Sequence, residues 1–337
     1  MLTAIRSISL SKTFCGGLLH GLVVIALGGA SLTAGAQSYP NRPIWLVVPY
    51  PPGGATDVLG RLLGKSLGER LGQPLVIENR AGAATSIGAA YVAKAPADGY
   101  TLLITAGTTT FTINPALQAH VPYDPVQSFE PIGFATRLPL ILIAHPKFDA
   151  STLKQLLARA KAAPGKLSYG TFGEGSTAHF AGELLWYAAG VNLLHIPYKG
   201  SAPAMNDLIG GQIPLAIDTI TAAAPQIKAG KVKALAVTTA RRSALLPDVP
   251  TAAEQGVSGV DIDAWSILAT PRGLPPEVKR KLEQALADTL NDAEVRKQLL
   301  LNGFEPRYGT AAQAEALIDR ELPQMRALVR RANIRSN

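Results

Sequence analysis

Five short corners, rich in glycine and small polar residues, carry the groups best suited to holding a ligand. Each follows an apolar run typical of a strand. The corners are Pro52, Gly53, Gly54, Ala55, Thr56 and Asp57; Thr105 with Thr108; Gly173, Gly175, Ser176, Thr177 and His179; Tyr198, Lys199, Gly200 and Ser201; and Asp218. Glycines let a backbone approach a ligand closely, and helix starts offer unpaired N–H groups. Hydroxyls and main-chain amides of this kind favour a carboxylate ligand.

The first corner has the clearest local pattern. The β-branched run Ile44–Pro49 predicts a strand, and a helical pattern follows from about Thr56. The prolines and glycines between them predict a tight loop that ends at a helix N-terminus, which attracts anions. Asp57 has two open interpretations: it stabilises the helix start, or it meets the ammonium group of an amino acid.

Three motifs for nucleotide or covalent chemistry are incomplete. Gly64-Lys65-Ser66 resembles the end of a P-loop, but Leu59 stands where the motif requires its first glycine. The run 173–178 fits a dinucleotide-binding loop, yet no acidic residue ends the next strand to hold a ribose. Ser176 lacks both glycines of a nucleophile elbow. We therefore expect no cofactor.

His179 and Glu183 lie four residues apart and would share one helix face. A metal site needs a third ligand and orienting partners, and none is evident nearby. An exported hydrolase using Ser176 and His179 is a rival interpretation, but the sequence shows no acid to orient the histidine. We expect neither a metal site nor a catalytic residue.

The first 36 residues have the features of an export signal. A basic start precedes the apolar stretch Gly16–Ala30, and Ala34-Gly35-Ala36 forms a cleavage site. The apolar stretch is shorter than the roughly 20 residues that a membrane span needs. The sequence predicts cleavage after Ala36 and a periplasmic location.

Composition narrows the class of ligand. Cleavage leaves roughly 300 residues, enough for about two domains. It also removes Cys15, the only cysteine. The formal net charge is +8, but charged residues make up only 17% of the chain and the basic residues are dispersed. This pattern argues against nucleic acid and favours small anionic solutes.

The alternation of strand-like and helix-like segments predicts an α/β fold with two doubly wound sheets joined by two crossings. We expect one lobe to contain residues 37–137 and 240–337, and the other residues 138–239. The segments Pro275–Leu290, Ala293–Leu301 and Ala311–Ala332 have helical patterns and no strands of their own. We expect them to return to the first lobe, and ligands to bind between the lobes.

Several segments in order along the chain resemble one known family. The matching segments are Tyr39-Pro40, Arg42-Pro43-Ile44, Val47–Gly54 with Asp57, Glu78-Asn79-Arg80 with Gly82, Ala97–Leu103, Asn114-Pro115, Tyr123-Asp124-Pro125, Pro164–Leu167, Pro197–Gly200, Gly210-Gly211-Gln212 and Leu246–Thr251. They resemble the extracytoplasmic solute receptors of tripartite tricarboxylate transporters, the Bug or TctC family. The resemblance covers essentially all of the chain after the leader.

The resemblance implies a two-lobed Venus flytrap that is not an enzyme. It implies that a carboxylate is bound through four of the corners, at Pro52–Asp57, Gly173–Thr177 with His179, Tyr198–Ser201 and Asp218. It also implies delivery to the membrane permease subunits of such a transporter, and we expect a monomer. A receptor that signals to a membrane sensor is an open alternative. Phe172 and Glu174 add bulk and negative charge to a loop that is smaller and more neutral in the family, which argues against a citrate-like ligand. Thr108-Thr109-Thr110 stands where many members have a histidine.

Overall fold

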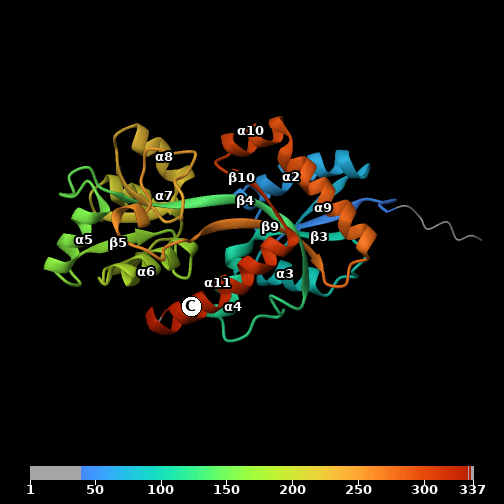
Figure 1. The fold of residues 1–337 in the computed structure, drawn as a ribbon, viewed down its shortest axis with the longest axis horizontal. Helices are drawn as coiled ribbons and strands as arrows, with labels where there is room; N and C mark the ends of the chain where they lie inside the picture. The colour runs from blue at the N-terminus through green and yellow to red at the C-terminus, as the bar shows by residue number, and fades with distance from the viewer. Residues whose placement is uncertain (1–38, 333, 335–337) are drawn as a thin grey trace, which may run out of the picture. The chain divides into compact units, whose positions relative to one another are not determined.

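The computed structural model describes residues 39–332 and 334. The proposed leader lies outside the described residues. Strands and helices alternate along most of the chain (Figure 1). The strands are β1 (Ile44–Val48), β2 (Leu75–Asn79), β3 (Thr101–Ala106), β4 (Phe129–Ala144), β5 (Ser168–Thr171), β6 (Leu194–Pro197), β7 (Leu215–Thr219), β8 (Lys233–Val237), β9 (Asp263–Pro271) and β10 (Glu305–Thr310). The helices are α2 (Ala55–Leu71), α3 (Ser86–Ala93), α4 (Asn114–Leu117), α5 (Leu153–Ala162), α6 (Thr177–Ala189), α7 (Ser201–Ile209), α8 (Ile220–Lys228), α9 (Pro276–Asn291), α10 (Ala293–Leu301) and α11 (Ala311–Ala332).

The ten strands of the described residues form one mixed sheet, in the order β2-β1-β3-β9-β4-β7-β5-β6, with β8 and β10 also paired to β4. The sequence predicted two separate sheets. Strand β4 joins them because it is 16 residues long. It pairs with β9 and β10 over its first part, and with β7 and β8 from about Leu140 onward. Figure 1 shows β4 running beside β9 and on past it.

Two sets of parallel strands fix where the corners lie. Strand β1 pairs in parallel with β2 and β3, so the loops after these three strands lie at one edge of the sheet. Strand β5 pairs in parallel with β6 and β7, which places the loops after those strands at another common edge. All five corners therefore follow the carboxyl ends of parallel strands.

Successive side chains of β4 point to opposite faces of the sheet, and both faces are buried there. Leu140 and Leu142 join a hydrophobic cluster with Tyr169 and Phe180, whereas Ile141 and Ile143 join a different cluster on the opposite face. A third cluster surrounds β1, β3 and β9 and is centred on the fully buried Trp265. Such two-sided burial is the arrangement that helix-covered sheets require. No helix in the described part of the chain is both long and apolar enough to cross a membrane.

Candidate functional site

The loop between β1 and α2 presents main-chain groups to solvent. Gly53 has a φ of +81°, a conformation that strains any residue with a side chain. Gly54 begins α2 in an extended conformation, and no side chain accepts a hydrogen bond from the first turn. Pro52, Gly53, Gly54 and Ala55 are exposed, and Thr56 is half-buried. The N–H groups of the first turn have no acceptor within the helix, so they are available to an anion.

Asp57 is buried directly beneath this loop and is fully engaged. Its carboxylate accepts hydrogen bonds from Gly53 N at 2.9 Å, Arg61 Nε at 2.9 Å and Asn79 Nδ2 at 2.8 Å. The hydrogen bond from Arg61 is the main reason that the pKa of Asp57 falls to about 2. These contacts support the structural interpretation of Asp57, which fixes the loop from below. They also occupy the N–H of Gly53.

A strained turn after β2 lies at the same edge and was missed from the sequence. Ala83, Ala84 and Thr85 all have positive φ, at 45°, 48° and 83°. Three such residues in succession are costly for side chains with a Cβ, and strain of this kind is frequent at binding sites. Asn114 holds the turn by donating to Ala84 O and to Thr85 Oγ1. Only Gly82 (φ +130°) gave a hint in the sequence.

Thr105 near the end of β3, and Thr108 and Thr110 after it, are buried and hydrogen-bonded to one another or to β9. Thr110 Oγ1 lies 2.6 Å from Thr105 Oγ1 and 2.9 Å from Thr85 Oγ1, which links the corners after β2 and β3. Thr108 Oγ1 donates to Asp263 O and accepts from Trp265 N. Both predicted residues thus have structural partners, and their part in ligand binding stays a prediction.

The loop after β5 is organised around the start of α6. Ser176 caps the helix by accepting from His179 N, and its hydroxyl donates to Gly173 O at 2.6 Å. His179 Nδ1 accepts from Gly175 N at 3.2 Å. The only hydrogen bond from His179 to Ser176 comes from the main chain, so the histidine is not placed as a base for this hydroxyl. Thr177 is buried in the first turn of α6.

The corners after β6 and β7 meet through one short hydrogen bond. Ser201 Oγ donates to Asp218 Oδ2 at 2.5 Å, and burial raises the pKa of the Asp218 carboxyl. Gly200, with a φ of +120°, begins α7, and no side chain caps that helix. Tyr198 is turned to Asp207, to which its hydroxyl donates at 2.8 Å, while Lys199 is exposed.

The two groups of corners approach each other at one point. A Cβ built on Gly175 would lie 2.8 Å from Leu117 Cδ2 of α4. Ile113, which precedes α4, lies in the same hydrophobic cluster as Phe180 of α6. The chain after β3 thus touches the loop after β5. Within residues 39–332 and 334, no set of three or more His, Cys, Asp or Glu side chains could hold a metal ion.

Comparisons with known proteins agree over nearly the whole described chain. A family model described as "Tripartite tricarboxylate transporter family receptor" matches residues 59–334. Protein BugT of Bordetella pertussis is 35% identical over 308 residues, which cover 91% of this chain and 94% of BugT.

Two similar solved structures are complexes with a carboxylate. R. palustris Rpa4515 with adipate is 36% identical, with a TM-score of 0.74, over 88% of this chain and 99% of that one. MatC (Rpa3494) from Rhodopseudomonas palustris with bound malate is 31% identical, with a TM-score of 0.70, over 86% of this chain and 100% of that one. The likeness confirms an α/β periplasmic-binding-protein fold.

Proposed function

Because the chain belongs to the tripartite tricarboxylate transporter receptor family, we propose that it captures a small dicarboxylate between two lobes and delivers it to membrane subunits of such a transporter. Like the other members of this family, the chain is a periplasmic solute-binding protein and not an enzyme. We place the mature chain in the periplasm after cleavage behind Ala36. The five corners would form the binding site.

The strand pairing supports two lobes, residues 37–137 with 240–337 and residues 138–239. The chain crosses between the lobes in β4 and again ahead of β9. Main-chain hydrogen bonds join the segments next to these crossings: Thr238 N donates to Leu140 O, and Ile262 N donates to Thr238 O. The last turns of α11 bridge both lobes, because Met325 and Leu328 pack in the cluster around Phe180. Closure would therefore bend β4 near Leu140 and shift the contacts of Met325 and Leu328 across the two lobes.

One observation gives the main support for the proposed binding site. Helices α2 and α7 both begin at glycines, Gly54 and Gly200, and neither has a side-chain cap. Helices α5, α6, α8 and α10 begin at Thr, Ser or Asp residues that accept hydrogen bonds from their first turns. Helices α3 and α9 also lack a side-chain cap, but they do not begin at predicted corners. Two open helix starts at predicted corners offer one anion site for each carboxylate of a dicarboxylate.

The ligand class follows from the same corners and from the relatives. Adipate and malate, the ligands in the two solved relatives, each have two carboxylates. Glu174 adds a negative charge to the loop after β5, and a Cβ on the preceding Gly173 would lie 3.6 Å from Tyr198 O of the second open corner. This charge opposes a third carboxylate on the ligand. Asp57 is fully engaged by protein donors, so it is not free to meet an ammonium group.

A capping series at Gly54 tests the site without disturbing the fold. Gly54 has a φ of −75°, and a Cβ there would meet only Pro51 O at an ordinary 3.5 Å. Isothermal titration of mature protein with mono-, di- and tricarboxylates would compare Gly54→Ala, Gly54→Ser and Gly54→Asp. Alanine adds no acceptor, serine occupies the free N–H groups, and aspartate also repels the ligand.

We expect dicarboxylate binding to survive Gly54→Ala, weaken in Gly54→Ser and vanish in Gly54→Asp, while the melting temperature is kept. Thr152→Asp is the matched control, because it adds the same charge at the capped start of α5, away from the corners. Undiminished binding in Gly54→Asp would show that this corner does not hold the ligand. Mass spectrometry of molecules released on denaturing the wild-type protein would identify the natural dicarboxylate.

A further inference from the structure

A cavity of about 410 Å³ lies outside the candidate carboxylate site and shares no residue with it. Four arginines line it: Arg137 of β4, Arg241 after β8, Arg307 of β10 and Arg320 of α11. Asp261 is the one acidic residue of the lining. Its volume lies within the roughly 300–1,000 Å³ typical of pockets that bind small molecules.

Two of the four arginines are already engaged by acids. Arg137 Nε lies 2.5 Å from Asp263 Oδ2, and Arg137 Nη2 lies 3.8 Å from Asp261 Oδ1. Arg320 Nη2 lies 3.9 Å from Glu321 Oε1. Asp261 also accepts a hydrogen bond from Ala240 N, which holds it at the edge of the lining.

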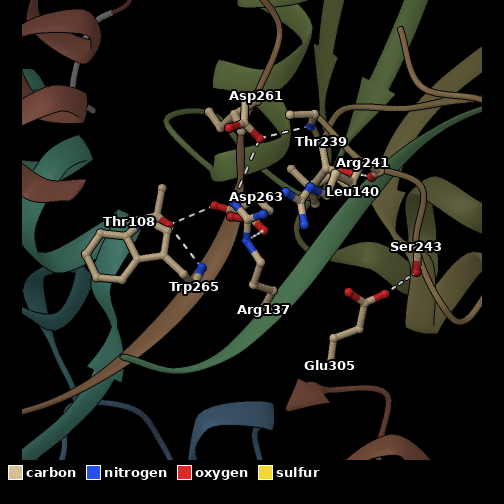
Figure 2. Close-up of polar contacts among 12 residues, drawn as sticks. Thr108, Arg137, Leu140, Thr239, Arg241, Ser243, Asp261, Asp263, Trp265 and Glu305 are labelled. Carbon is tan, nitrogen blue, oxygen red and sulfur yellow. Dashed lines mark hydrogen bonds and ion pairs between the residues drawn. The ribbon is translucent and has the colours of Figure 1, made fainter. Parts of the chain in front are cut away.

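Arg241 and Arg307, unlike Arg137 and Arg320, form no close ion pair with an acid among residues 39–332 and 334. Both are exposed, and their guanidinium groups have no ion pair or hydrogen bond with any residue in the described part of the chain. The other acids nearby form their close contacts elsewhere: Asp263 is buried against Arg137, and Glu305 accepts a hydrogen bond from Ser243. Burial raises the pKa of the Asp263 carboxyl, and Arg307 acts on it only at longer range, where its charge opposes that rise. Figure 2 shows Arg137 and Arg241 gathered with the two aspartates, while Glu305 is turned to Ser243.

We propose that this cavity is a second anion site, which binds a small oxyanion with two or more negative charges through Arg241 and Arg307. A guanidinium group presents paired N–H donors that match two oxygens of a phosphate or a carboxylate. Arg241 and Arg307 come from segments far apart in the sequence, so one anion would join the segment after β8 to β10. The site does not depend on the carboxylate site, because no lining residue belongs to the five corners.

The test measures binding of inorganic phosphate and of citrate to mature protein by isothermal titration, against sodium chloride at matched ionic strength. Comparing phosphate with citrate distinguishes phosphate chemistry from carboxylate chemistry. The variant is Arg241→Ala with Arg307→Ala, and the control is Arg280→Ala, an exposed arginine on α9 with no partner in the described residues. Gly54→Asp removes the proposed carboxylate site and leaves the cavity intact.

We expect saturable binding of at least one oxyanion in the wild type, in Arg280→Ala and in Gly54→Asp. The double alanine variant should weaken it roughly tenfold or more, and lysine at both positions should give an intermediate loss, because the charge stays but the paired donors go. The lysine variant also keeps the test valid if the alanine variant folds poorly. Binding that Gly54→Asp abolishes and the arginine variants leave unchanged would overturn the proposal. So would heats no larger than those of sodium chloride.

Discussion

The imidazole rings of His179 and His195 are stacked, with centroids 3.7 Å apart and planes inclined by 14°. The pair lies behind the loop that carries Gly175, because His179 Nδ1 accepts from Gly175 N and His195 Nε2 lies 2.7 Å from Thr171 Oγ1. Burial lowers the pKa of His179 to about 4. Burial and the neighbouring His179 lower the pKa of His195 to about 3. Both rings are therefore neutral in the folded protein near neutral pH.

We predict that this pair makes the protein less stable as the pH falls below about 6.5, the ordinary histidine pKa. Between that pH and about pH 4 the unfolded chain binds protons that the folded chain does not, so the free energy of unfolding decreases. Urea unfolding across this range should show the loss. His195→Gln should reduce it, whereas His120→Gln, at an exposed position, should not. Equal profiles for the wild type and His195→Gln would contradict this role of the stacked rings.

Glu321 predicts an effect of opposite sign in an overlapping range. Burial is the main cause that raises its pKa to about 7, despite a hydrogen bond from Trp265 Nε1 at 2.9 Å; the nearby Asp263 raises it further. The folded protein holds this proton while the unfolded chain releases it from about pH 4.5, so Glu321 lowers stability as the pH rises to about 7. Glu321→Gln keeps an acceptor for Trp265 and removes the ionisation.

We expect Glu321→Gln to gain roughly 1–3 kcal/mol in unfolding free energy relative to wild type between about pH 5 and pH 8. Asp319→Asn, an exposed acid on the same helix, is the control and should change little. Because the histidine pair and Glu321 act in opposite directions, the loss of stability on acidification should be steeper in Glu321→Gln than in the wild type, and smaller in His195→Gln. A constant difference between Glu321→Gln and wild type across this range would exclude the buried ionisation.

Local patterns predicted the regular elements well. The strand at 44–48, the helix after Gly54 and the three C-terminal helices all lie within a few residues of their expected positions. Their apolar residues recur with the period of the element that forms. The family identification from motifs is confirmed by the match over residues 59–334.

Long-range and strained features were not predicted. The first half of β4 contains Pro131 and Gly133, which interrupt a strand pattern, and its pairing with β9 is irregular there and again between Phe134 and Thr136. Strand β10 contains Pro306 and the exposed Arg307, so it carries no apolar alternation. The turn Ala83–Thr85 depends on Asn114, about 30 residues away, and no local pattern encodes that contact.

Asp57 should prove structural rather than specific for an amino acid. Asp57→Ala removes the buried carboxylate that accepts from Gly53 N, Arg61 and Asn79, so three hydrogen bonds to a charged group are lost. We expect a loss of roughly 2–3 kcal/mol in unfolding free energy, and equal weakening for dicarboxylates and amino acids. Arg61→Ala is the control: the Arg61 side chain is 55% exposed, so its loss should cost less than about 1 kcal/mol. If amino acids alone lost affinity in Asp57→Ala, the carboxylate would be meeting an ammonium group.

Gly107 should be the least replaceable glycine beside the candidate site. It directly follows β3, and a Cβ there would lie 1.7 Å from Cζ3 of Trp265, whose ring is fully buried and tied to Glu321. The ring cannot yield without breaking that hydrogen bond and its packing. We therefore expect Gly107→Ala to lose about 3 kcal/mol in unfolding free energy.

Gly54→Ala is the matched control for Gly107→Ala, because the same methyl group there meets only Pro51 O at 3.5 Å. Near-ultraviolet circular dichroism should report the displaced tryptophan in Gly107→Ala alone. Because Thr108 bonds both Asp263 O and Trp265 N, the displacement should also disturb the corner after β3 and weaken dicarboxylate binding. A Gly107→Ala protein with wild-type stability would mean that β3 and β9 can separate at this point, and the threonine corner would then not be rigidly placed.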